Sequence, residues 1–154
     1  MFFSILLWAI FGILSWVIAW QDFTSRHISF LLSIVMGVIL IVLSFLQGSC
    51  FTFWWIERLG GSLLPGGVLL AGALRKKAGW GDVLVAFIYG WYVGLFHTGW
   101  WLLFSLVFAW VEVGVKLLKK ETQPLIPFVS WMTVGFWLWL TSYSLGWLPV
   151  PYRF

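Results

Sequence analysis

The sequence contains few charged residues. Only 9% of its 154 residues are charged, whereas 62% are hydrophobic, and the mean hydropathy is +1.01. A chain with so few charges cannot cover a water-facing surface with polar groups, which excludes an ordinary soluble domain. We therefore expect lipid to surround most of the chain, and we expect residues 1–154 to form one membrane-embedded domain.

Cysteine is nearly absent as well. Cys50 is the single cysteine, so the chain offers neither an internal disulfide nor a cysteine-based zinc site. The two histidines, His27 and His97, are expected at opposite membrane faces as interfacial polar groups, where they cannot hold a metal together. We therefore predict no metal and no cofactor.

Long apolar runs dominate the sequence instead. A membrane-spanning helix needs roughly 20 apolar residues, because the hydrocarbon core is about 30 Å thick and each helical residue rises about 1.5 Å. Six runs approach this length and predict an all-α fold, a polytopic membrane protein with six transmembrane helices. They cover approximately residues 2–20, 28–47, 59–74, 81–96, 100–118 and 125–145.

The third and fourth runs have irregular features. The third contains Pro65 together with Gly60, Gly61, Gly66 and Gly67, which predicts a short or broken helix where a neighbouring helix approaches closely. The aromatic segment 51–58 before it is expected to lie at the membrane interface. A turn at residues 97–99 is expected to separate the fourth and fifth helices.

The basic residues indicate orientation. They lie in short clusters between apolar runs rather than along one face, which argues against nucleic-acid binding despite a net charge of +4. Lys and Arg concentrate in cytoplasmic loops, so the side that carries most of them is predicted to be cytoplasmic and both termini to lie outside. Seven of the nine basic residues fall on that side: Arg26, Arg75, Lys76, Lys77, Lys116, Lys119 and Lys120.

Two aspartates are predicted to share one depth. Asp22 would close the first helix at the cytoplasmic face, and Asp82 would open the fourth helix at the same face. An ionisable group at the centre of a membrane helix costs about 2.5 to 3.5 kcal/mol, so each one calls for an explanation. Separately, each aspartate has an ordinary structural interpretation, Asp22 as the partner of Arg26 and Asp82 as a helix cap.

Together, the two carboxylates predict an aspartyl-protease dyad. Repulsion between close carboxylates allows the pair to hold one proton, so that the ionised partner takes a proton from water while the protonated partner polarises the scissile carbonyl. Gly79 and Gly81 flank Trp80 directly before Asp82. They are expected to let the backbone bend and approach an extended substrate.

The residues around both aspartates resemble the type IV prepilin leader peptidases, membrane proteases of the Gly-x-Gly-Asp aspartyl class. The first matching element is Asp22-Phe23-Thr24-Ser25-Arg26-His27-Ile28-Ser29, similar to the family's aspartate, basic residue and Ile-Pro-Asn. The second is Gly79-Trp80-Gly81-Asp82-Val83, followed by Gly90 and Gly94. Further matches are the glycine-rich stretch 60–66, Ile126-Pro127-Phe128 and Gly135.

The chain departs from the family pattern beside the predicted site. Ser29 and Phe30 replace Pro-Asn, and Leu84 replaces a lysine. Ser130 and Trp131 replace a Pro-Phe pair. Larger members also carry a cysteine-containing methylating domain, which this chain lacks, so it resembles the short, peptidase-only branch.

The resemblance implies that Asp22 and Asp82 are the catalytic pair, with Gly79 and Gly81 as supporting motif residues. It implies an aspartic endopeptidase, without a cofactor, in the cytoplasmic membrane of a bacterium or archaeon. Its protein partner would be a prepilin-like substrate, and the cut would follow a glycine and release a short basic leader.

Two other functions fit parts of the pattern. A small ion or proton transporter also uses paired membrane aspartates, but it predicts them near the midplane. A noncatalytic pilus-assembly subunit on a peptidase scaffold is suggested by the departures at Ser29, Leu84 and Ser130. Glu112 and Lys116 are predicted to form an ion pair at i,i+4 spacing, with a substrate contact as the alternative.

Overall fold

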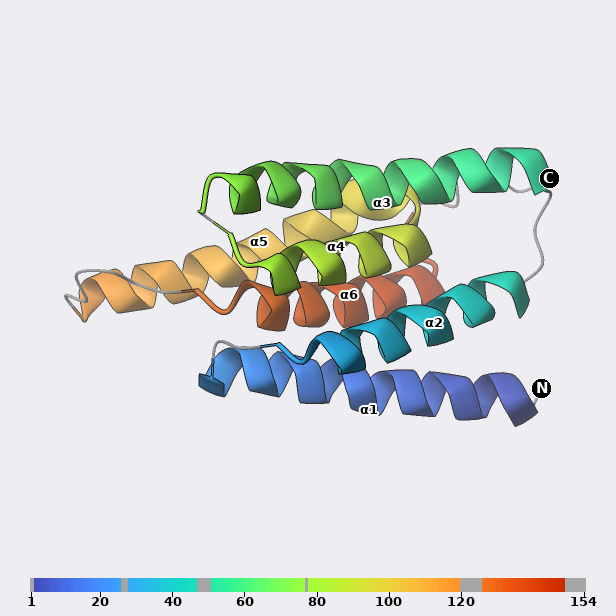
Figure 1. Ribbon diagram of the computed structural model, residues 1–154, viewed down its shortest axis with the longest axis horizontal. Coiled ribbons are helices and arrows are strands. Elements are labelled where there is room, and N and C mark those ends of the chain that lie inside the picture. The colour runs from blue at the N-terminus through green and yellow to red at the C-terminus, as the bar shows by residue number, and fades with distance from the viewer. Residues whose placement is uncertain (1, 26–27, 47–50, 77, 120–125, 149–154) are drawn as a thin grey trace.

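The computed structural model describes residues 2–25, 28–46, 51–76, 78–119 and 126–148. Within these ranges the chain is all-α, with six helices and no strand (Figure 1). The helices are α1 (Phe2–Ser25), α2 (Phe30–Leu46), α3 (Phe51–Leu74), α4 (Trp80–Val93), α5 (Leu95–Leu118) and α6 (Phe128–Ser144). The prediction of an all-α chain is confirmed.

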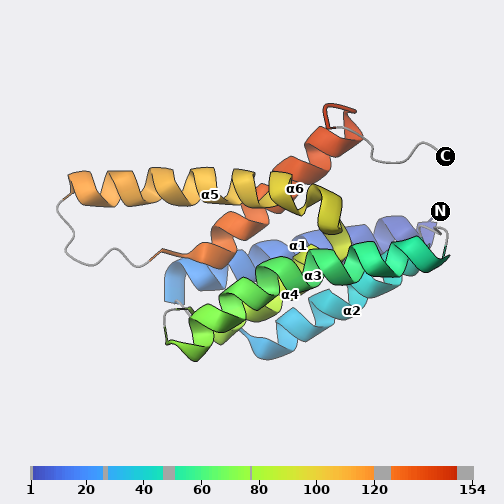
Figure 2. The same cartoon turned by 90° about the horizontal axis from the view of Figure 1, so that it is seen from above.

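Consecutive helices run in opposite directions along the long axis of the molecule (Figure 1). The last residues of α1, α3 and α5 therefore lie toward the same end as the first residues of α2, α4 and α6. The final turns of α5 extend beyond the other helices in both views (Figures 1 and 2). We call this end, which holds Asp22 and Asp82, the aspartate end.

Four helices form a ring around the core. α1 packs against α2 and α6, and α4 packs against the same two helices. The backbones of α1 and α4 lie farther apart, and their side chains meet in the interior, where the rings of Trp8 and Tyr92 are in edge contact. α3 packs outside α4, and α5 packs on α6 and α3. The end of α1 and the start of α4 are therefore linked through α2 and α6, so Asp22 and Asp82 lie on different sides of the ring.

Aromatic and polar contacts specify the ring's interior. Tyr89 stacks on Phe136 with ring centroids 4.6 Å apart, and its hydroxyl shares a 2.9 Å hydrogen bond with Thr133. The indole of Trp101 donates to the carbonyl oxygen of Met132 at 3.0 Å. Because lipid is as apolar as a protein core, such packing and interhelical hydrogen bonds hold membrane helices together better than apolar burial alone.

α3 is one continuous helix, so the prediction of a short or broken third helix is wrong. It begins at Phe51, and the segment expected at the interface forms its first turns. A side chain at Gly61 would come within 2.5 Å of the Gly90 carbonyl oxygen, and one at Gly90 would come within 3.0 Å of the Pro65 ring. The glycines thus let α3 and α4 approach along their backbones, and Pro65 is accommodated inside the helix by its neighbour.

The break between α4 and α5 lies at Gly94, not at residues 97–99. Gly94 has φ +78°, a conformation that favours glycine. His97 and Thr98 consequently belong to the first turns of α5 and are buried. His97 packs among Phe96, Trp139 and Tyr143 instead of forming an exposed interfacial group; His27 lies outside the described residues.

Two of the described segments are long and apolar enough to span a bilayer, Ile5–Ser25 and Leu95–Leu118. The shorter helical segments Phe30–Leu43 and Trp80–Val93 are apolar as well. Less than a third of either long segment's most apolar window is buried, 28% and 17% respectively, so both expose apolar side chains as a lipid-facing helix does. This favours association with a membrane.

Candidate aspartate site

Asp22 lies in the last turn of α1, because the helix continues past the predicted end at Trp20 to Ser25. The hydroxyl groups of Thr24 and Ser25 donate to the carbonyl oxygens of Trp20 and Gln21, each at 2.8 Å. These hydroxyl groups form their hydrogen bonds within the helix, so the polar residues that were predicted to form a loop are accommodated in the last turn of α1. The carboxylate is thereby carried on a rigid element, and only 6% of Asp22 is exposed.

Ser130 holds the carboxylate of Asp22. Its backbone N–H donates to Asp22 Oδ2 at 3.1 Å, and its hydroxyl donates to the same oxygen at 3.3 Å and to the Ala19 carbonyl oxygen at 2.8 Å. Ser130 is the third residue of α6, where backbone N–H groups lack partners within the helix and the helix dipole favours an anion. The start of α6 therefore stabilises negative charge on Asp22.

Asp82 lies in the first turn of α4 and is half-buried. Its Oδ2 accepts a 3.1 Å hydrogen bond from the N–H of Gly79, the residue before the helix. The N-cap position is therefore occupied by Gly79, and Asp82 caps the helix from its third residue by accepting the Gly79 N–H. The cap fixes the position of the carboxyl group and uses one of its two oxygens.

The structure brings Asp22 and Asp82 to the same end of the bundle. The two groups lie on different helices of the ring, Asp22 in the last turn of α1 and Asp82 in the first turn of α4. Their assignment as a catalytic pair stays a prediction. Arg26, the expected partner of Asp22, lies outside the described residues.

Gly81 lies where the segment that follows α1 packs on the start of α4. A side chain there would come within 2.7 Å of Ile28 Cδ1, so Ile28, from the segment after α1, packs directly on the start of α4. Gln21 adds a second link through its side-chain oxygen, which accepts the N–H of Ser29 at 3.3 Å. The space at Gly81 is therefore filled by the protein's own Ile28, which differs from the expected role in approaching a substrate backbone.

Glu112 and Lys116 form the predicted ion pair, with Nζ and Oε1 2.5 Å apart. Glu112 also accepts a hydrogen bond from the indole of Trp131, and that indole stacks on Phe108 with centroids 5.7 Å apart. Glu112 is therefore engaged within the protein, which favours the ion pair over a substrate contact.

Sequence reasoning treated Ser130 and Trp131 only as departures from a family pattern. The signal that was present is positional, since Ser130 follows a Pro127 that begins a helix and so falls in its first turn. Its partner Asp22 is 108 positions away in the chain, which no local pattern reveals. Among the described residues, no three His, Cys, Asp or Glu side chains gather closely enough to hold a metal ion.

No protein-family model, curated protein sequence or solved structure significantly matches this chain. The resemblance to prepilin peptidases therefore stays a prediction from the motifs around Asp22 and Asp82.

Proposed function

We propose that the protein is an intramembrane aspartic endopeptidase that cuts the leader from prepilin-like precursors. The observation that carries the proposal is the placement of two acidic residues, Asp22 in the last turn of α1 and Asp82 in the first turn of α4, at one end of a largely apolar helical bundle. Two like charges at one end oppose each other and add no stability, so their placement calls for a function.

The hydrogen bonds divide the roles within the pair. Two donors from Ser130 favour negative charge on Asp22, which suits it to take a proton from an attacking water. Asp82 then holds the shared proton and donates it toward the carbonyl oxygen of the scissile bond. The water oxygen adds to the carbonyl carbon to give a tetrahedral diol. As the C–N bond breaks, the amine leaves with the proton that Asp22 took from water, and a hydroxyl group of the diol returns a proton to Asp82. The cycle needs neither a covalent intermediate nor a cofactor.

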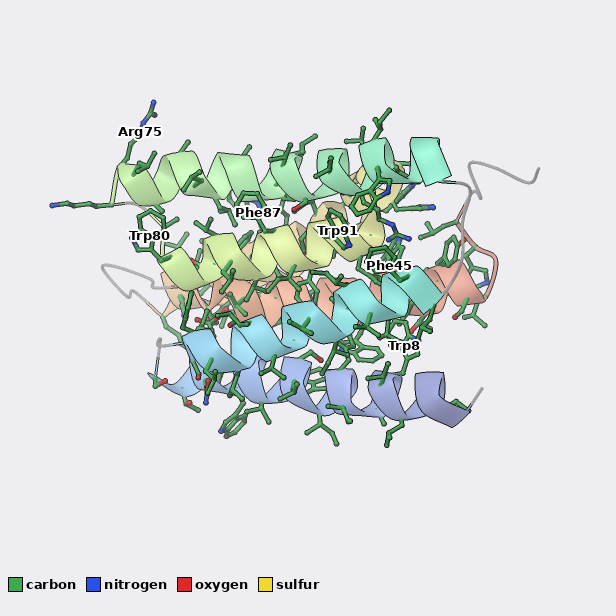
Figure 3. All side chains as sticks on the ribbon, turned by 45° about the vertical axis from the view of Figure 1, so that its right-hand side comes forward. Trp8, Phe45, Arg75, Trp80, Phe87 and Trp91 are labelled. Carbon is green, nitrogen blue, oxygen red and sulfur yellow. The ribbon has the colours of Figure 1, made fainter. Side chains whose placement is uncertain are left out.

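The proposed topology has six membrane-spanning helices, with the aspartate end at the cytoplasm and both termini outside. Figure 3 places Arg75 and Trp80 at the aspartate end, while Trp8 and Phe45 lie toward the other end. Arg75 and Lys76 follow α3 there, and Lys116 and Lys119 end α5 there, as the cytoplasmic excess of basic residues predicts. Cleavage would occur at the cytoplasmic face of the membrane.

A reconstituted cleavage assay tests the proposal. The wild-type protein in liposomes is incubated with a prepilin-like substrate that has a basic leader, a glycine before the cut and an apolar helix, and the products are identified by mass spectrometry. We expect one cut after the glycine, and we expect Asp22→Asn and Asp82→Asn each to abolish it. Glu57→Gln makes the same carboxyl-to-amide change at the other end and should retain cleavage. Normal activity in either aspartate variant would refute the pair.

The second candidate is a noncatalytic pilus-assembly subunit. It is favoured by one observation, namely that both carboxylates have local structural partners, Gly79 for Asp82 and Ser130 for Asp22. In the same assay it predicts that the wild-type protein binds the substrate without cutting it. An ion transporter is less consistent with acids at the end of the bundle than with acids near its middle.

A further inference from the structure

A pocket opens between α1 and α6 beside Asp22. Its volume is about 270 Å³ and its lining is almost wholly apolar. The floor consists of small or medium-sized side chains and the walls are tryptophans: Ala19, Ser130 and Val134 in the floor, and Trp16, Trp20 and Trp131 in the walls. We call this feature the α1–α6 groove. Small residues between larger ones allow another helix to approach closely within a membrane.

The groove is continuous with the candidate site. Ser130 lines the groove and also donates both hydrogen bonds to Asp22 Oδ2. On another side of the site, Ile28 already covers Gly81 at the start of α4. The α1–α6 side is therefore a route by which a group held in the apolar layer can reach the Asp22 carboxylate.

Trp131, in one wall of the groove, is held in place by contacts with α5. Trp131 stacks on Phe108 of α5 and donates to Glu112, and Glu112 is paired with Lys116. A surface that faces only fluid lipid needs no such support, because lipid chains adapt to any apolar shape, and ion pairs on membrane helices are costly. A preformed wall instead lowers the ordering cost of binding a defined partner.

We propose that the α1–α6 groove receives the apolar transmembrane helix of the substrate and so places the peptide bond at that helix's cytoplasmic end against Asp22. Trp16 and Phe23, both in the lining, are about two helical turns apart, so the groove engages about two turns of the partner. This inference rests on the proposed peptidase function and adds to it the surface that recognises the substrate.

The test compares two substrates in one preparation. One carries the leader, the cleavage site and the apolar helix, and the other is a water-soluble peptide with the same leader and cleavage site but no helix. Val134→Trp fills the groove floor, and we expect it to lower the preference for the helix-bearing substrate, measured as the ratio of the two kcat/KM values, about tenfold. A misfolded variant loses both activities together and leaves the ratio unchanged, so folding is controlled within the experiment.

Val38→Trp is the matched control. Val38 lies on α2, is 55% exposed and does not line the groove, so we expect the wild-type ratio. A wild-type ratio in a Val134→Trp protein that still cuts the water-soluble peptide at the wild-type rate would overturn the groove while leaving the peptidase proposal intact. Failure of the wild-type protein to cut either substrate would overturn the proposed function and the groove with it.

A crosslinking measurement checks the same surface without relying on Val134. A photoreactive phenylalanine analogue at Phe23, which lines the groove and is 53% exposed, should crosslink to the substrate's apolar helix in the Asp82→Asn background. The same analogue at Phe30 of α2, which is 70% exposed, should not. Equal crosslinking at the two positions would contradict the groove.

Discussion

The two ends of the bundle differ in how their charged side chains are arranged. At the end away from the aspartates, Arg58 donates to the carbonyl oxygen of Trp91 at 3.2 Å and lies 5.4 Å from the centre of the Tyr92 ring. Glu57 lies against Gly94, where α5 begins. A cation thus faces the C-terminal end of α4 and an anion the N-terminal end of α5, and each complements a helix dipole.

The Glu57–Arg58 arrangement is explained by structure alone, since opposite charges stabilise the sharp turn at Gly94. The aspartate end has no such explanation. There, two acidic residues share one end of the bundle, and the backbone N–H groups of Ser130 and Gly79 donate to Asp22 and Asp82 respectively. Comparison of the ends therefore indicates which charges hold the fold and which are available for chemistry.

Removing an aspartate should have the largest effect on activity. Asp82→Asn deletes the proton donor, and we expect cleavage to fall at least about 10³-fold, in the range of general acid catalysis. Unfolding of the purified protein by denaturant should change little, because the loss of the cap is partly offset by relief of repulsion from Asp22. A variant that lost stability as steeply as activity would make Asp82 a structural residue.

Removing the cation at the other end should reverse this pattern. Arg58→Met leaves Glu57 without its neighbouring positive charge, and we expect the free energy of unfolding to fall by about 2 kcal/mol. Cleavage per folded molecule should persist. Glu57→Gln in the Arg58→Met background should restore part of the stability, as a denaturant titration in micelles would reveal.

The same glycine-to-alanine change should have different consequences at the two ends. Gly94 has φ +78°, which an alanine rarely adopts, and the added Cβ would also approach the Glu57 carboxylate. We therefore expect Gly94→Ala to lower the free energy of unfolding by about 1 to 2 kcal/mol.

Gly81→Ala places a Cβ atom 2.7 Å from Ile28 Cδ1 and 3.0 Å from Ile28 Cβ. We expect it to displace that segment and reduce cleavage about fivefold, roughly 1 kcal/mol. Ile28→Val removes the Cδ1 atom in question, and the double variant should regain activity. Failure of this rescue would argue against packing of Ile28 on Gly81.

The smallest effect is expected at Ser130. Ser130→Ala removes the hydroxyl but keeps the N–H, so one of two donors to Asp22 is lost. We expect kcat to fall about fivefold with KM unchanged, since one hydrogen bond to a charged group contributes about 1 to 2 kcal/mol. Ser130→Thr should restore kcat, whereas an equal loss in both variants would indicate a packing role.

Predictions from the sequence failed where a local pattern of residues was interpreted without the contacts that the folded chain makes there. Pro65 and its glycines predicted a broken helix, but the backbone of α4 fits against them. Polar residues after Trp20 predicted a loop, but their hydroxyls bond back onto α1. His97 was placed in a turn because it is polar, whereas Gly94, three residues earlier, supplies the positive φ that ends α4.

The number of helices and their alternating direction follow from the lengths of the apolar runs and the positions of the polar loops, which are local properties of the chain. These local properties alone predict that Asp22 and Asp82 lie at the same end of the bundle. The donation from Ser130 to Asp22 and the α1–α6 groove depend on contacts between distant residues, such as that of Ser130 with Ala19, 111 positions away. Such contacts arise only when the helices pack, because side-chain shape and helix rotation decide which faces meet.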